Sequence, residues 1–137
     1  MTEQLLNANL LTLSKVSLKV IQSGTRYVQD VRGAREDIDR LLQEVTTLQR
    51  LSTELERLLS GPYGGKLTLS RELAPRVQET LVKLEEIRKK FGEHGSGSRS
   101  SAVHFKWPLW QHDVKGAMQD LTRCSSELHL ALQIDQA

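Results

Sequence analysis

Histidine and cysteine are two residue types in this 137-residue chain that could bind a metal ion or act as a nucleophile. No two histidines lie three or four residues apart, the helical spacing that would place two imidazoles on one metal ion. The single cysteine lacks neighbours that mark a nucleophile, and a helical cysteine commonly packs as a small apolar residue. We therefore expect no metal site and interpret these side chains as surface or packed residues: His94, His104, His112, His129 and Cys124.

The glycine-containing segments and the carboxylates do not indicate an enzyme either. Gly65-Lys66 resembles the end of a phosphate-binding loop, but Leu67 stands where a hydroxyl would hold the metal ion, and no strand precedes the segment. Carboxylates such as Glu54 and Glu85 alternate with basic residues on polar helix faces, which is typical of a solvated surface. The sequence thus predicts a non-enzymatic protein with no catalytic residues and no cofactor.

Aromatic and basic residues alternate between Arg88 and Trp110, a pattern that could serve nucleic-acid or anionic-lipid binding. We favour a structural role, because basic residues near a helix C-terminus complement its dipole and a Trp-Pro pair can close the end of a bundle. The net charge of +2, from 19 basic and 17 acidic residues, does not indicate such a partner. We expect no nucleic-acid partner, and we expect Trp107, Pro108 and Trp110 to join a Gly/Ser loop to the last helix.

Long amphipathic helices are the elements that would position these residues. The first is predicted over about residues 3 to 32. Leu11 and Leu18 form a narrow second stripe outside its broad apolar face, and Lys15 and Lys19 line the opposite face. The broad face, with Asn9 as a polar member, consists of Leu5, Leu6, Leu10, Leu13, Val16, Val20 and Ile21.

Three further helices are predicted near residues 34 to 60, 75 to 91 and 108 to 133. Gly33 and Gly61-Pro62 are expected to end the first two helices, and Pro75 to separate a short lead-in from the third. The segment 92 to 101 is predicted to be flexible. The apolar stripes are Ile38, Leu41, Val45, Leu48, Leu51, Leu55 and Leu58, then Leu73, Val77, Leu81, Leu84, Ile87 and Phe91, then Val114, Met118, Leu121, Leu128 and Leu132 with Ser125.

These four helices, without alternating strand patterns, predict one all-α domain: an antiparallel four-helix bundle with a flexible Gly/Ser loop before the last helix. One cysteine excludes an internal disulfide and fits a reducing compartment. The N-terminus lacks a basic signal-peptide region, and Lys15 and Lys19 interrupt the apolar stretch that a transmembrane span would need. We therefore expect a cytoplasmic protein.

Three segments together resemble a known family. They are residues 27 to 34 (Tyr-Val-Gln-Asp-Val-Arg-Gly-Ala), residues 38 to 45 with Leu48 and Leu51, and above all Phe105 to Trp110 with residues 128 to 133. The chain is similar in these segments to the fungal N-terminal domain of STAND (NLR-like) proteins, a HeLo-like domain also named after an azaphilone pigment cluster protein. The resemblance implies that residues 1 to 137 form a single HeLo-like bundle, the N-terminal part of a longer chain with a NACHT-type module.

The same resemblance implies a non-enzymatic signalling domain that acts through protein–protein contacts. Such a domain self-associates or regulates the attached NACHT-type module, in programmed cell death or heterokaryon incompatibility. A second function stays open, in which the first helix leaves the bundle and permeabilises a membrane to which the protein is recruited on activation. Both place the effector in residues 2 to 21, with these candidate interaction or membrane residues: Leu5, Leu6, Leu10, Leu11, Leu13, Leu18, Val20 and Ile21.

Overall fold

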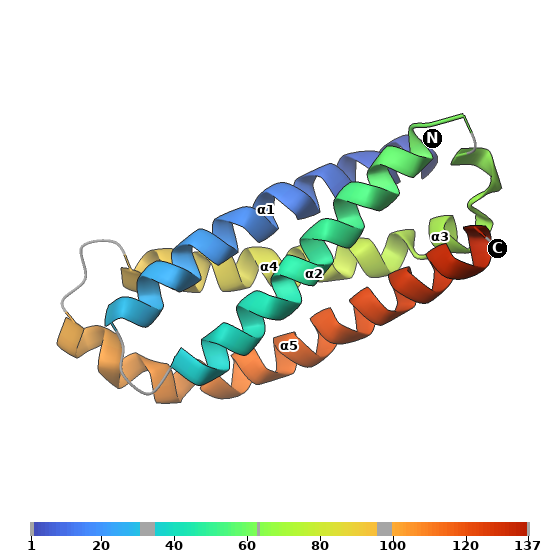
Figure 1. The fold of residues 1–137 in the computed structure, drawn as a ribbon. Coiled ribbons are helices and arrows are strands. Elements are labelled where there is room, and N and C mark those ends of the chain that lie inside the picture. The colour runs from blue at the N-terminus through green and yellow to red at the C-terminus, as the bar shows by residue number, and fades with distance from the viewer. Residues whose placement is uncertain (1, 31–34, 63, 96–99, 137) are drawn as a thin grey trace.

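Four long helices make up most of the molecule (Figure 1). The computed structural model describes residues 2–30, 35–62, 64–95 and 100–136, with side chains described for 5–26, 35–62, 64–91 and 111–136. Over these residues the chain is helical apart from short connections, so the predicted all-α helical bundle is confirmed. The elements are α1 (Thr2–Asp30), α2 (Arg35–Leu59), the 3₁₀ turn η1 (Gly64–Lys66), α3 (Thr68–Glu72), α4 (Ala74–Gly95) and α5 (Ser100–Gln136).

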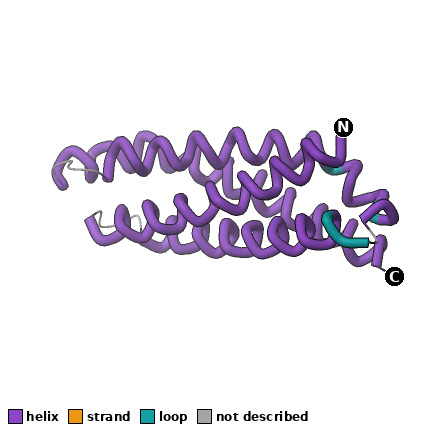
Figure 2. The backbone as a smooth tube through the Cα atoms, turned by 90° about the horizontal axis from the view of Figure 1, so that it is seen from above, coloured by secondary structure: helices purple, strands orange, loops and turns teal. Residues whose placement is uncertain are grey.

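The long helices form two hairpins, α1 with α2 and α4 with α5, and the chain reverses direction within each (Figure 1). Across the hairpins, α1 packs along α4 and α2 packs along α5. In Figure 1 these neighbours of different hairpins run in the same direction. Helices α1 and α5 therefore occupy opposite corners of the bundle, as do α2 and α4. Figure 2, seen from above, shows the two chain termini at the same end.

The helix boundaries follow the sequence signals closely, with one exception. The predicted lead-in before Pro75 is the short helix α3, and α2 ends just before Gly61-Pro62. The predicted start of the last helix near Pro108 is wrong, because α5 begins at Ser100 and continues through the proline. An interior proline removes one backbone hydrogen bond and clashes with the carbonyl four residues earlier, but its φ is close to the helical value, so a helix can bend at it without ending.

The segment predicted to be flexible, residues 92 to 101, is helical at both of its ends. Residues 92 to 95 close α4 and residues 100 and 101 open α5, while residues 96 to 99 lie outside the described residues. Gly33, the predicted end of the first helix, also lies outside them. The connection from α4 to α5, within the second hairpin, is therefore shorter than the Gly/Ser composition predicted.

The predicted apolar stripes build the core. Its buried apolar members on α1 and α2 are Leu6, Leu10, Leu13, Val16, Val20, Ile38, Leu41, Val45, Leu48 and Leu55. Those on the rest of the chain include Val77, Leu84, Ile87, Phe91, Val114, Leu121, Cys124, Leu128 and Leu132. The placement of Leu5 on the core face is wrong: its side chain is 57% exposed. It lies at the edge of the apolar arc and near the first residue of α1, where the core no longer covers it.

Small residues let α1 approach its neighbours closely. Ser17 and Gly24 are buried on the core side of α1. A Cβ added at Gly24 would lie 2.8 Å from Leu42 Cδ2 and 3.3 Å from Phe91 Cε2. Because Leu42 belongs to α2 and Phe91 to α4, Gly24 marks the point at which three helices meet at close range.

Asp135, near the end of α5, fixes the position of α3. Its carboxylate accepts hydrogen bonds from the backbone N–H groups of Leu69 (3.2 Å) and Ser70 (2.8 Å), and from the Ser70 hydroxyl (2.7 Å). The first N–H groups of a helix have no partner within it, so an acidic side chain from elsewhere can cap them. This contact ties the connection between the hairpins to the C-terminal helix.

Candidate functional site

The eight candidate interaction residues of α1 divide into two groups. Leu6, Leu10, Leu13 and Val20 are buried in the core, and Ile21 packs against it while partly exposed. Three of the candidates remain at the surface: Leu5, Leu11 and Leu18. The buried members hold the bundle together, so in the folded bundle only the exposed ones can contact another molecule.

Leu11 and Leu18 form the centre of a surface that we name the α1 ridge, made of Leu11, Lys15, Leu18 and Lys19. Both leucines are 47% exposed, and both lysines are exposed. The spacings of four, seven and eight residues from Leu11 place Lys15, Leu18 and Lys19 on one strip of the helix with it. Neither lysine pairs with a carboxylate among the side chains that the structure describes. The ridge is therefore apolar along its length and positively charged at its side.

Uncharged hydrogen bonds between α1 and α2 lie beside the ridge. The hydroxyls of Ser14 and Thr53 share a hydrogen bond of 3.1 Å, and Gln49 Nε2 donates to both, at 3.1 Å and 3.2 Å. Ser14 immediately precedes Lys15, so this group fixes the neighbouring part of α1 on α2. It offers donors and acceptors to solvent but no charge.

A second exposed apolar surface lies at the end of the bundle that holds both termini. We name it the α3–α5 hollow; its volume is about 240 Å³. Leu130 and Ile134 of α5 are 58% and 52% exposed there, beside Leu69 of α3. Its lining is Leu69, Glu72, Leu73, Glu127, Leu130, Ala131 and Ile134. The walls are thus apolar, and the two charged residues that line the hollow are both acidic.

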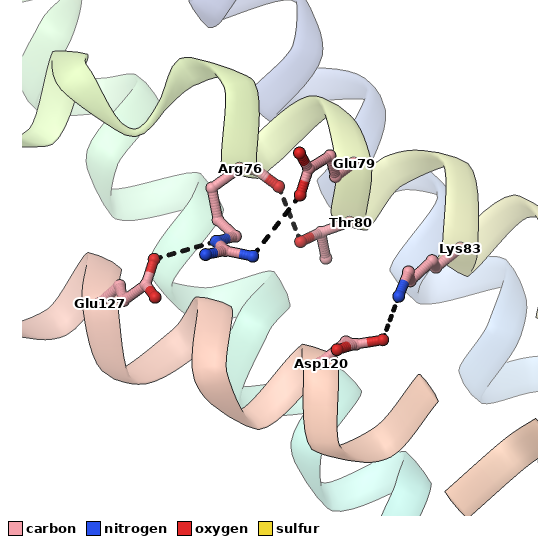
Figure 3. Close-up of polar contacts among 6 residues, drawn as sticks. All are labelled: Arg76, Glu79, Thr80, Lys83, Asp120 and Glu127. Atoms are coloured by element: carbon pink, nitrogen blue, oxygen red, sulfur yellow. Dashed lines mark hydrogen bonds and ion pairs between the residues drawn. The ribbon is translucent and has the colours of Figure 1, made fainter. Parts of the chain in front are cut away.

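Among the described side chains, three ion pairs connect α4 to α5. Arg76 Nε bonds Glu127 Oε2 at 3.0 Å, and Lys90 Nζ lies 3.1 Å from Asp113 Oδ2. Lys83 pairs with Asp120 between them (Figure 3). The basic residues follow one another at intervals of seven along α4, and their acidic partners follow at intervals of seven in the opposite direction along α5. This matched spacing is what two antiparallel helices require. We call this set the α4–α5 ladder.

The sequence interpretation missed the ladder, because charged residues were assigned to solvated helix faces in general. The signal that could have found it is the seven-residue spacing of the three basic residues, matched by the same spacing of three acidic residues. The hydrogen bond that Arg76 donates to Glu127, together with the negative charge of that carboxylate, raises the pKa of Arg76. The Lys83–Asp120 and Lys90–Asp113 pairs line a groove of about 420 Å³. The buried side chains of Ile87 and Val114 line it as well.

The described cysteine and histidine candidates differ in burial. Cys124 is fully buried, and this burial raises the pKa of its thiol, opposed in part by a hydrogen bond from Thr80. A raised pKa keeps the thiol protonated at neutral pH, which lowers its nucleophilicity. His112 and His129 are exposed on α5, and the side chains of His94 and His104 lie outside the described residues. No group of three metal-binding side chains occurs in the described part of the chain.

Trp107, Pro108 and Trp110 have their backbone within α5, and their side chains lie outside the described residues. Their role in joining the Gly/Ser segment to the last helix stays a prediction. Among the described helices, none combines the length and the apolar character needed to cross a membrane.

No family model, no curated protein and no solved structure matches the chain.

Proposed function

We propose that this protein is a non-enzymatic signalling domain of the HeLo-like type, which acts by self-association through the α1 ridge. The observation that carries the proposal is the exposure of Leu11 and Leu18 on a helix whose other apolar face already completes the core. Single exposed leucines are common on protein surfaces. Two on one strip, flanked by lysines without ion-pair partners among the described residues, form a surface suited to a protein partner.

The resemblance in sequence supports the same assignment, since it places the effector part in the first helix. In a HeLo-like protein this bundle would precede a NACHT-type module and signal through that module, in programmed cell death or heterokaryon incompatibility. The proposal concerns a HeLo-like four-helix bundle built from two antiparallel hairpins, in which α1 has two tasks. Its core face maintains the fold, and its outer strip meets the partner.

Sedimentation velocity over a range of protein concentrations tests the proposal. The wild type should form species larger than a monomer, and the variant Leu11→Glu/Leu18→Glu should shift the distribution to the monomer. Val82→Glu is the matched control, because Val82 is an exposed apolar residue on α4 outside the ridge. Circular dichroism should show equal helicity for all three proteins. A wild type that stays monomeric at the highest concentrations would contradict the proposal.

Membrane permeabilisation by a released α1 is the second candidate, favoured by the distribution of its side chains. Outside the bundle, the core face and the ridge leucines would cover most of the helix circumference, with Lys15 and Lys19 on the remaining side. A helix of this kind binds anionic membrane surfaces. This second candidate function predicts that the wild type causes dye leakage from anionic liposomes. The leakage should fall in a Lys15→Glu/Lys19→Glu variant of unchanged helicity. Absence of leakage with the wild type would exclude it.

A further inference from the structure

We propose that copies of this protein associate head to tail, with the α1 ridge of one copy seated in the α3–α5 hollow of the next. This inference rests on the proposed self-association and names the surface that receives the ridge. Seven large apolar side chains are exposed among the described residues. Two of them stand on the ridge and three line the hollow. Most of the apolar surface available for contacts is thus gathered in these two places.

The charges of the two surfaces are complementary. Lys15 and Lys19 flank the leucines of the ridge, while Glu72 and Glu127 line the hollow. Glu127 already pairs with Arg76, so Glu72 is the main complementary charge. Glu72 is exposed and has no ion pair within the described residues. A ridge leucine inserted between Leu130 and Leu69 would bring a ridge lysine near an acidic side chain. Charge complementarity of this kind favours docking of a ridge in a hollow. Contact between two ridges would instead place lysines next to lysines.

The α4–α5 ladder stops where the hollow begins, at the junction of α3 and α4. One further step of seven residues beyond Arg76 and Glu127 leads to Leu69 and Ile134. At that step two exposed apolar residues stand in place of an ion pair, and both line the hollow. The α4–α5 side therefore changes from charged pairs to an apolar surface at the end of the bundle.

The positions of the two surfaces set the form of the assembly. The ridge is on α1 and most of the hollow is on α5, and these helices occupy opposite corners of the bundle. One copy therefore cannot fill its own hollow with its own ridge. Each docking step also leaves one ridge and one hollow unoccupied, so the contact is heterologous and produces rings or open chains.

Two complementary variants test the arrangement in sedimentation velocity. Leu11→Glu/Leu18→Glu removes the ridge and keeps the hollow, while Leu130→Lys/Ile134→Lys removes the hollow and keeps the ridge. Each variant alone should be monomeric. An equimolar mixture should form one-to-one dimers and nothing larger, because it contains one intact ridge and one intact hollow per pair.

The outcomes separate this inference from the proposed function. If the wild type associates and the hollow variant still associates by itself, the ridge meets another surface, and the head-to-tail inference is overturned while self-association stands. A monomeric wild type would overturn both.

Charge exchange adds a readout that simple loss of folding would not produce. The copy that supplies the ridge is the Leu130→Lys/Ile134→Lys variant, and adding Lys15→Glu/Lys19→Glu to it should weaken the mixed dimer at least several-fold. Adding Glu72→Lys to the other copy, the Leu11→Glu/Leu18→Glu variant that supplies the hollow, should restore the affinity of the mixed dimer. Failure of this rescue, with both variants folded, would show that the lysines do not meet Glu72 and would overturn the proposed docking.

Discussion

Between α1 and α2, apolar side chains meet at close range, and the hydrogen bonds of Ser14 involve no charged group. Between α4 and α5, by contrast, the described side chains form three ion pairs, two of which line a groove of about 420 Å³. Close apolar packing contributes much of the stability of a fold, and exposed ion pairs contribute little each. Ion pairs in fixed register do select the direction and alignment of two helices. We infer that the first hairpin mainly supplies stability and that the second is aligned by its charges.

The largest expected effect comes from enlarging a glycine in each hairpin. Gly24→Leu should lower the free energy of unfolding by about 1–3 kcal/mol, because a larger side chain overpacks the meeting point of α1, α2 and α4. Gly116→Leu on α5 is the matched control. A Cβ there meets nothing within 4 Å, so the better helix propensity should raise stability by roughly 0.5–1 kcal/mol. Urea unfolding followed by circular dichroism measures both.

Equal losses at the two glycines would show that the hairpins are packed alike, contrary to the comparison. A gain at Gly24 would show that Leu42 moves aside easily, since the nearest atom to the added Cβ is the end of a flexible side chain.

The α4–α5 ladder should respond to charge reversal and to salt. Lys83→Glu/Lys90→Glu places carboxylates opposite Asp120 and Asp113. Each exposed pair contributes about 0.2–1 kcal/mol, so we expect the double change to cost roughly 0.5–2 kcal/mol at low salt. The cost should shrink in 1 M NaCl, where the Debye length falls to about 3 Å. Urea midpoints at both salt concentrations measure it.

Reversing the acidic partners as well, with Asp113→Lys and Asp120→Lys added, should restore most of the lost stability. Restoration requires that the pairs meet in the register seen in the structure. A fourfold variant no more stable than the double variant would show that the charges act only through the overall field of the bundle.

The sequence predicted the parts of the fold that depend on local periodicity. The stripes on α2 and α4 could be assigned because residues such as Leu41 and Leu84 recur at helical spacing, and Pro75 marked the boundary between α3 and α4. Which helices become neighbours was not predictable in this way. The packing of α1 along α4 depends on contacts between distant residues, such as Gly24 with Phe91.

The candidate site was predicted only in part, for a related reason. The narrow stripe of Leu11 and Leu18 could be found from the spacing of one helix, and its exposure agrees with its position outside the broad face. The hollow could not, because Leu69 and Ile134 come together only when α3 folds onto the end of α5. The prediction for Leu5 was wrong because periodicity gives the side of the helix on which a side chain lies, but not whether a neighbouring helix extends far enough to cover it.

The smallest expected effect lies in the uncharged contacts of the first hairpin. Ser14→Ala removes the hydroxyl that hydrogen-bonds to Gln49 Nε2 and to Thr53 Oγ1, each at 3.1 Å. Water can replace these bonds at a partly exposed site, and alanine is the better helix former, so stability should change by about 0.5 kcal/mol or less. The change should also be the same at 0.1 M and 1 M NaCl, since no charge is involved. A loss above about 1 kcal/mol would mean that polar contacts, and not close packing, align the first hairpin, so that the two hairpins would differ in charge alone.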